Sequence, residues 1–514
     1  MHQMYNWLLN LCRKILVTLS SLLCDSSLYV RLYFVLRQLF FLILYSISLF
    51  ISPTFAANPL PEDIKGALCV VRADDKLVLI HEILTNKISL PGGTIIEGES
   101  PKLAAQRETW EETGLVVTVG DELGRTDTAV FFDCVSDSEV IAFSMTNSLD
   151  GNELPIWFAP HYGVEVASAM LVEPSNMAAS LYRYPTQWAD VAGFYSHATD
   201  QPVVYVDQLI ESAPSFRQAE LSWMVDLQSW VGSFSESSRE MACEVADMIT
   251  GLSSPTFLLF LFPFVMMKFD SRFVYRLFFA VTATSLMALV AQQGFSLPRP
   301  HVYMPMAELT QSFGFSFPSL PIAVWFCVMT FLFQRTNSFG LNRITLSVAL
   351  VTLTVMACKF FLGTAFILDM FIGAVLGVLV AWHVLRLESN PDVDVDKLLS
   401  SKSVWFTMTA ITAFLSVIWP LPVFTSWLAI LITASALVMT FKESEIRFER
   451  QQMLFVILAL LLVEQLYLYL GTTVSFSGFW SLVFNTFHYP LLMIIFVILS
   501  RKLITESEID VAKQ

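Results

Sequence analysis

The chain has 514 residues, of which 55% are hydrophobic and 15% charged, and its formal net charge is −15. This composition excludes an ordinary soluble protein and indicates a membrane protein. The negative charge and the lack of a Lys and Arg cluster exclude nucleic acid as a partner, because binding phosphates requires such a cluster.

The first segment to interpret is residues 1–57. An apolar run, Leu39 to Ile51, follows Arg31 and Arg37 and leads into the small-residue stretch 53–57, which is typical of a signal peptidase site. Residues 1–57 are therefore a signal anchor or a signal peptide, and the long region upstream of the apolar run favours an uncleaved anchor.

Residues 58–232 have the composition of a globular domain. Short β-rich runs at Gly66 to Val71 and Lys76 to His81 precede a helical stretch, Lys102 to Glu112, which predicts a mixed α/β domain. The polar stretch that follows predicts a linker over residues 233–252.

Two cysteines of this domain leave an alternative open. Cys69 and Cys134 pair if the domain is exported, but the interpretation favoured from sequence is two buried thiols.

Apolar segments dominate the chain after residue 253, and most approach the ~20 residues that a membrane span requires. With the N-terminal segment they predict about ten transmembrane helices, the last four (403–502) without a readable motif. The nine segments lie near 256–268, 273–293, 319–334, 344–362, 366–386, 403–419, 422–441, 451–471 and 478–500.

Basic residues predict the orientation, because short cytoplasmic loops are enriched in Lys and Arg. An N-terminus inside the cell places the α/β domain outside, on the periplasmic side of an inner membrane. The residues then placed in the cytoplasm are Arg13, Lys14, Arg31, Arg37, Lys268, Arg272, Arg276, Arg335, Arg343, Arg386, Lys397, Lys402, Lys442, Arg447, Arg450, Arg501 and Lys502.

The main chemical signal is a group of acidic residues on the predicted helix. Glu108, Glu111 and Glu112 stand at i, i+3 and i+4, so their carboxylates share one helix face. Their mutual repulsion requires a cation, and oxygen ligands suit Mg²⁺ or Mn²⁺. Arg107 is four residues before Glu111 and is placed to orient it, and Gly92-Gly93 allows a close backbone approach.

This segment resembles the signature of the Nudix hydrolase family, Gly-x5-Glu-x7-Arg-Glu-U-x-Glu-Glu-x-Gly-U, in which U is a bulky apolar residue. Thr109 departs from the pattern, at a position that packs. The residues that match are Gly93, Glu99, Arg107, Glu108, Glu111, Glu112, Gly114 and Leu115.

The resemblance implies an α/β/α sandwich over residues 65–230 that hydrolyses diphosphate linkages. Glu108, Glu111 and Glu112 are then the metal ligands, with Arg107 as a further catalytic residue and Gly93 and Glu99 in support. The general base is left open, with Glu139 as one candidate, and so is the substrate, either a diphosphate-containing small molecule or a lipid-linked diphosphate. Two aromatic-rich stretches either stack a base or belong to the core, and the core is favoured. They are Trp157 to Tyr162 and Tyr182 to Trp188.

Three passages in residues 253–390 resemble the phosphatidic acid phosphatase type 2 superfamily, whose pattern is Lys-x6-Arg-Pro, Pro-Ser-Gly-His and Ser-Arg-x5-His-x3-Asp. The match is degenerate, because Gln292 replaces the Lys, Pro321 replaces one His and Ala365 replaces the nucleophilic His. His301 and His488 do not occupy matching positions. The residues retained as a phosphate-binding remnant are Arg299, Ser319, Lys359 and Asp369.

Without either histidine this membrane domain is predicted to lack phosphatase activity while still contacting membrane lipid. Asp369 in an apolar span needs a partner, for which Lys359 is one candidate. The leading hypothesis is thus a membrane-bound Nudix hydrolase. The alternatives are a lipid phosphatase of the undecaprenyl-diphosphatase type, and a nucleotide or lipid-phosphate sensor without catalysis.

Overall fold

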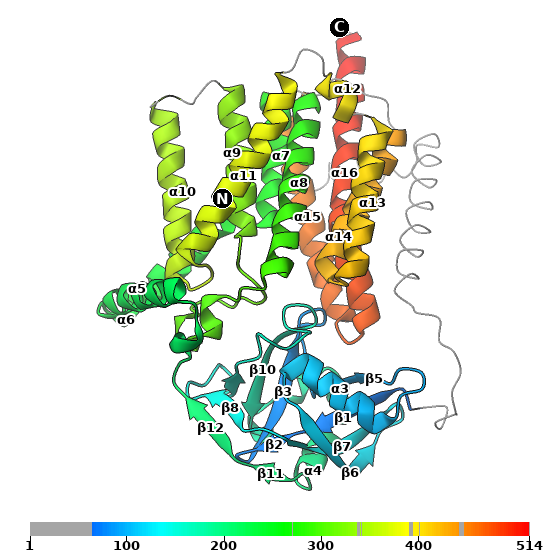
Figure 1. The fold of residues 1–514 in the computed structure, drawn as a ribbon. Helices are drawn as coiled ribbons and strands as arrows, with labels where there is room; N and C mark the ends of the chain where they lie inside the picture. Colours follow the sequence, from blue (N-terminus) through cyan, green and yellow to red (C-terminus); the bar gives the residue numbers. More distant parts are fainter. Residues whose placement is uncertain are drawn as a thin grey trace, which may run out of the picture.

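The structure is a computed structural model that describes residues 64–512, apart from 270, 337–339, 341, 390–393, 400 and 441–446. The predicted signal anchor, residues 1–57, lies outside the described residues. The described chain has two parts, an α/β domain and a set of long helices at one end of it (Figure 1).

The α/β domain contains two main sheets. One has the order β5-β1-β7-β6, and the other has the order β11-β2-β3-β10-β9 with β4 paired to β3, while β8 and β12 form a separate pair. The strands are β1 (Gly66–Val70), β2 (Arg72–Ala73), β3 (Lys76–Glu82), β4 (Ile88–Ser89), β5 (Gly92–Thr94), β6 (Val117–Arg125), β7 (Ala129–Ser136), β8 (Val140–Phe143), β9 (Asn152–Leu154), β10 (Val166–Val172), β11 (Asp200–Gln201) and β12 (Val203–Val206).

Helices cover both faces of the sheet that contains β1. Ala67 and Cys69 on one face pack with α3 (Pro101–Thr113), whereas Val70 on the other face packs with α4 (Trp188–Tyr195). This alternation follows from the period of two along a strand. The predicted α/β/α sandwich is confirmed.

A disulfide joins two neighbouring strands inside this domain. Cys69 of β1 and Cys134 of β7 are fully buried and bonded, with their Cα atoms 5.5 Å apart. The interpretation as two buried thiols is therefore wrong. Sequence spacing alone could not decide it, because 65 residues separate the two positions and the parallel pairing of β1 with β7 brings them together.

We expect the double variant Cys69→Ala/Cys134→Ala to lower the free energy of unfolding by about 2–4 kcal/mol, because the bond closes a long loop. Thermal denaturation of the purified full chain measures the loss, with Cys243→Ala as a control that removes a free thiol. Maleimide labelling of the denatured chain should gain two thiols after reduction. Equal labelling before and after reduction would contradict the disulfide.

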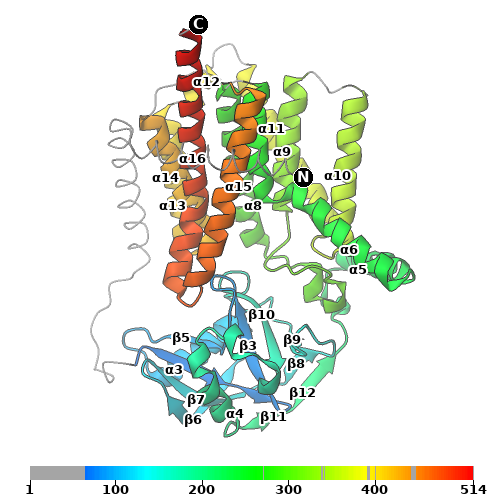
Figure 2. The ribbon, with the colours of Figure 1, turned by 180° about the vertical axis from the view of Figure 1, so that it is seen from behind.

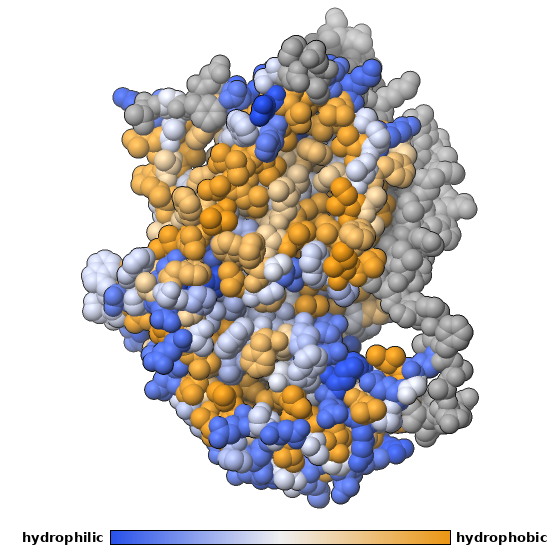
Figure 3. Space-filling model, viewed as in Figure 1, coloured by the Kyte–Doolittle hydropathy of each residue, from blue (hydrophilic) through white to orange (hydrophobic). Residues whose placement is uncertain are grey.

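The helical part extends away from the α/β domain in both views (Figures 1 and 2). Its surface is a broad apolar band with hydrophilic residues at the far end (Figure 3), as expected of membrane-spanning helices. The helices are α5 (Ser215–Gly232), α6 (Glu236–Thr250), α7 (Leu258–Lys268), α8 (Ser271–Phe295), α9 (Leu320–Arg335), α10 (Arg343–Phe361), α11 (Ile367–Glu388), α12 (Val395–Leu399), α13 (Lys402–Ile418), α14 (Pro422–Thr440), α15 (Arg450–Val474) and α16 (Gly478–Ala512).

Each of the nine predicted spans after residue 253 coincides with a helix, but the count of about ten transmembrane helices is not confirmed. Within the described residues six helices are long and apolar enough to cross a membrane, or seven if the bent pair Glu236–Ser253 and Pro255–Lys268 is one span. Leu320–Arg335 and Lys402–Ile418 are apolar but shorter. At ~1.5 Å per residue they fall short of a hydrocarbon core of ~30 Å.

Helices α5 and α6 lie across the ends of the other helices, next to the α/β domain (Figures 1 and 2). The predicted linker, 233–252, is mostly α6, whose Ala246 packs on Phe361 and Leu362 at the end of α10. Polarity at residues 235–240 suggested a linker, but apolar residues spaced further along give the segment a packing face. Helix α5 falls within the predicted Nudix range, yet its Leu221 and Met224 pack with the helical part.

Candidate functional site in the α/β domain

Helix α3 carries the acidic residues, and its ends are fixed by local sequence. Ser100 caps the start, since its Oγ accepts a hydrogen bond from the Leu103 amide at 3.3 Å, and Pro101 suits the first turn. The helix ends at Gly114, which adopts a left-handed φ of 73° and donates its N–H to the Trp110 carbonyl. The three glutamates therefore lie on a helix of defined length.

Strand β5 lies against the acidic face of α3. The Gly92 amide donates to a carboxylate oxygen of Glu112 at 2.8 Å. A Cβ added to Gly93 would lie 2.5 Å from Cδ of Glu108, so only glycine leaves this carboxylate where it is. The Gly92-Gly93 pair therefore sets the position of two of the three glutamates.

We expect Gly93→Ala to displace the Glu108 carboxylate and to weaken divalent-metal binding by at least about tenfold, the lower end of the loss usual when a ligand's support is removed. The fold should survive, because the atoms in the way are the end of a flexible side chain. Calorimetric titration of the full chain with Mn²⁺ measures the affinity. Gly66→Ala is the control, because a Cβ there meets only ordinary contacts, whereas Gly98 has a left-handed φ of 84°. Equal Mn²⁺ affinity of Gly93→Ala and Gly66→Ala would contradict this role of Gly93.

Arg107 holds the acidic side chains together. Its guanidinium contacts Glu99 at 2.9 Å, Glu108 at 2.9 Å and Glu111 at 2.8 Å. The predicted contact between Arg107 and Glu111, one helical turn apart, is confirmed. The hydrogen bond from Arg107 holds the pKa of Glu99 below its usual value, and the hydrogen bond to Glu99 raises the pKa of Arg107.

Burial makes the charged state of two glutamates costly. Desolvation raises the pKa of Glu108, although the Arg107 charge opposes it. Desolvation raises the pKa of Glu112 well above its usual value, opposed by the Gly92 amide and reinforced by the Glu108 charge. Carboxylates that are buried and close together are stabilised in their ionised form by a bound cation.

A loop outside the predicted motif completes the cluster. The backbone N–H of His161 donates to the Glu111 carbonyl at 2.8 Å, which places the imidazole beside α3. Ligand atoms of Glu108, Glu111 and His161 all lie within 4.8 Å of one another. A carboxylate oxygen of Glu165 lies 3.5 Å from Nδ1 of His161. A set dominated by carboxylate oxygens fits Mg²⁺ or Mn²⁺.

Two further charged residues, Glu82 and Arg183, lie near Glu112. Glu82 of β3 accepts hydrogen bonds from Thr85, from Ser89 and, at 3.0 Å, from Arg183. Burial lowers the pKa of Arg183, but the charges of Glu82 and Glu112 oppose this effect and the pKa is raised above its usual value. The Nε of Arg183 is buried and has no hydrogen-bond partner among the described residues. These residues lie outside the motif, and the sequence held no spacing signal for them or for His161 and Glu165.

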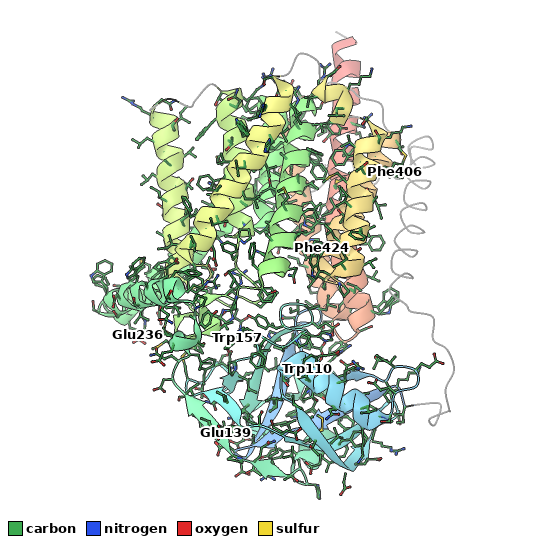
Figure 4. All side chains as sticks on the ribbon, viewed as in Figure 1. Trp110, Glu139, Trp157, Glu236, Phe406 and Phe424 are labelled. Atoms are coloured by element: carbon green, nitrogen blue, oxygen red, sulfur yellow. A yellow bond between two sulfur atoms is a disulfide. The ribbon has the colours of Figure 1, made fainter. Side chains whose placement is uncertain are left out.

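The structure also tests the other sequence candidates in this domain. Glu139 is exposed in the turn between β7 and β8 and lies well away from α3 (Figure 4), so it is not part of the cluster. Tyr162, Tyr182 and Trp188 are buried, as the core interpretation predicted, but Phe158 and Tyr184 of the same stretches are exposed, so that interpretation holds only in part. Thr109 is fully buried, and its hydroxyl donates to the Ala105 carbonyl at 2.7 Å, which satisfies a polar group in an apolar position.

The remnant residues of the membrane domain lie at or near the ends of helices, and the described part of the chain bonds the side chains of Arg299 and Asp369 but only backbone atoms of Ser319 and Lys359. Arg299 donates to the carbonyls of Phe313 at 2.8 Å and Thr364 at 2.5 Å, and the backbone N–H of Ser319 donates to the Asp369 carbonyl at 2.9 Å. Lys359 lies at the end of α10, where its carbonyl accepts from Thr364.

Asp369 pairs with a residue that the sequence did not suggest. Arg217 of α5 is fully buried and donates to the Asp369 carboxylate at 3.0 Å and to the Pro298 carbonyl at 2.5 Å, and Ser316 donates to the same carboxylate. The candidate partner Lys359 is therefore wrong. Arg217 lies 152 residues before Asp369, so no local pattern could have linked them.

Comparisons with known proteins bear on the α/β domain first. Residues 64–185 match the NUDIX domain family. Over 71 residues the chain is 39% identical to a MutT-like protein of Streptomyces ambofaciens, a stretch that is 14% of this chain and 46% of that protein. The chain thus spans about half the length of the curated relative that it matches.

Similar solved structures include an LpxE and an ADP-ribose pyrophosphatase. LpxE of Aquifex aeolicus is 21% identical and covers 32% of this chain and 94% of its own, with a TM-score of 0.27. An ADP-ribose pyrophosphatase of Streptococcus suis is 18% identical and covers 27% of this chain and 96% of its own, with a TM-score of 0.19. The fold and the helix α3 define an α/β domain with a cluster of acidic side chains that could hold a metal ion. From the family match, residues 64–185 are a Nudix domain.

Proposed function

We propose that this chain is a membrane-bound Nudix hydrolase that cleaves a diphosphate linkage between a nucleoside diphosphate and another moiety, with Mg²⁺ or Mn²⁺. The observation that carries the proposal is the carboxylate cluster of α3, held by Arg107 and fitted against the glycines of β5. The partner is a diphosphate-containing small molecule or a lipid-linked diphosphate.

In this proposal Glu108, Glu111 and Glu112 hold the metal together with His161. The metal, when bound, offsets the charge of the diphosphate oxygens and acidifies the attacking water. Arg107 and Glu99 keep the ligands in position. Glu165 accepts the proton of the water, because its side chain is half exposed and borders the cluster, whereas Glu82 is already held by three hydrogen-bond donors.

EDTA treatment is expected to abolish hydrolysis, and Mg²⁺ or Mn²⁺ to restore it. At 100 times its Kd the metal should also raise the free energy of unfolding of the Nudix domain by about 2.7 kcal/mol. Release of the nucleoside monophosphate and thermal denaturation of the full chain, before and after metal addition, measure both effects. Turnover that survives EDTA, with no change in melting temperature, would contradict a metal-dependent site.

We further propose that the Nudix domain lies on the periplasmic side of an inner membrane. The basic residues Arg272, Arg335, Arg386 and Arg450 belong to the ends of spans far from the Nudix domain, as cytoplasmic ends require. The Cys69–Cys134 disulfide supports the same side, because such bonds persist in oxidising compartments.

A lipid phosphatase activity of the membrane domain is disfavoured by a specific contact. Arg217 already neutralises Asp369, Arg299 donates to backbone carbonyls, and Ala365 stands where the superfamily has its nucleophilic His. A sensor without catalysis is distinguished by turnover, because a domain that only binds its ligand releases no product.

A further inference from the structure

The loop that carries His161 and Glu165 is attached to the helical part. Tyr162 packs edge-on against Phe315 at 5.9 Å between ring centroids, and a Cβ added to Gly163 would lie 2.8 Å from Cα of Gly314. Val164 packs against a hydrophobic cluster of the helical part that includes Leu421. One wall of the metal site is thus fixed to the segments 297–319 and 419–421, which join α8 to α9 and α13 to α14.

Lys87 and Arg183, which contact Glu82, lie against the turn between α15 and α16 and the start of α16. The Lys87 ammonium lies 5.1 Å from the ring centroid of Phe476, and a Cβ added to Gly478 would lie 3.0 Å from a terminal nitrogen of Arg183. Arg183 in turn donates a hydrogen bond to Glu82, and the charge of Glu112 acts to raise the pKa of Arg183. Residues beside the proposed metal site therefore contact segments that join helices of the membrane part at two places.

These turns lie at the level where the membrane surface is expected. Helices α5 and α6 lie across the span ends at this level (Figures 1 and 2) and expose aromatic side chains, including Trp223 at 57% and Trp230 at 61%. Tryptophan at such positions is typical of the membrane interface. Trp110 of α3 is also exposed, at 45%.

We propose that the Nudix site takes its substrate from the membrane, as an amphiphile whose diphosphate reaches the metal while its apolar chains stay in the bilayer. This inference rests on the proposed function and specifies its substrate class. The Nε of Arg183, which is buried and has no hydrogen-bond partner among the described residues, donates to a phosphate oxygen. The aromatic side chains of Phe476, Phe479 and Trp480, each about half exposed, border the path of the chains.

The test compares two substrates with the same diphosphate bond, CDP-diacylglycerol in nanodiscs and water-soluble CDP-glycerol, using the full chain and Mg²⁺. We expect CDP-diacylglycerol to be cleaved with a kcat/KM at least about 100-fold higher, because the bilayer holds this substrate at a high effective concentration beside the site. Dilution of CDP-diacylglycerol with inert lipid at constant bulk concentration should lower its rate.

A matched pair of variants locates the recognition. Phe476→Ser should lower kcat/KM for CDP-diacylglycerol about tenfold more than for CDP-glycerol, consistent with losing one apolar contact. Phe234→Ser, which removes an aromatic side chain of similar exposure between α5 and α6, should change neither. Equal kcat/KM for both substrates would overturn the inference and leave the hydrolase intact, whereas no cleavage of either with Mg²⁺ would overturn the proposed function as well.

Discussion

Glu108→Gln is expected to lower kcat by about 1,000-fold with little change in the melting temperature of the metal-free protein, because glutamine keeps the shape and the hydrogen bond to Arg107 but removes a metal-binding charge. Burial raises the pKa of Glu108, which means that its charged form is costly in the metal-free protein. Removal of the charge therefore removes this desolvation cost and does not weaken the fold.

Initial rates at saturating Mg²⁺ and Mn²⁺ titrations measure this effect. Glu139→Gln is the matched control, since Glu139 is an exposed glutamate of the same domain that lies away from α3. Loss of activity in Glu139→Gln with none in Glu108→Gln would place the catalytic carboxylate elsewhere.

Arg217→Met is expected to destabilise the protein by about 3–5 kcal/mol, because it leaves the Asp369 carboxylate buried without its ion-pair partner. The double variant Arg217→Met/Asp369→Leu should recover most of this loss, since both charges are then removed. Thermal denaturation in detergent compares the three proteins.

Arg125→Met supplies the control for this prediction, because Arg125 pairs with Glu122 on the exposed surface, where removal of a pair costs at most about 1 kcal/mol. A double variant as unstable as Arg217→Met would show that the lost packing, and not the unpaired charge, causes the effect.

Local periodicity explains which parts of the site were predictable. The grouping of Glu108, Glu111 and Glu112 and the contact of Arg107 with Glu111 follow from helical spacing, and the structure has both. His161 and Glu165 come from a loop about fifty residues later that folds back onto α3, and no repeat or spacing in the sequence encodes that approach.

The membrane part shows the same limit. Hydropathy located the helices after residue 253, because an apolar run identifies a span without knowledge of its neighbours. It did not reveal that α5 belongs with these helices, since α5 carries charged residues such as Arg217 and Glu220. Their roles depend on Asp369 and on the backbone amides of Ile367 and Leu368 at the start of α11.

The most direct test of the central claim is hydrolysis by the purified full-length protein with Mg²⁺, measured side by side for the native chain, Glu112→Gln and Asp369→Asn. The substrates are ADP-ribose, nucleoside diphosphate sugars, dinucleoside polyphosphates, CDP-diacylglycerol and undecaprenyl diphosphate. We expect Glu112→Gln to abolish turnover and Asp369→Asn to retain it in the molecules that remain folded. Turnover lost in folded Asp369→Asn and kept in Glu112→Gln would assign catalysis to the membrane domain and contradict the account.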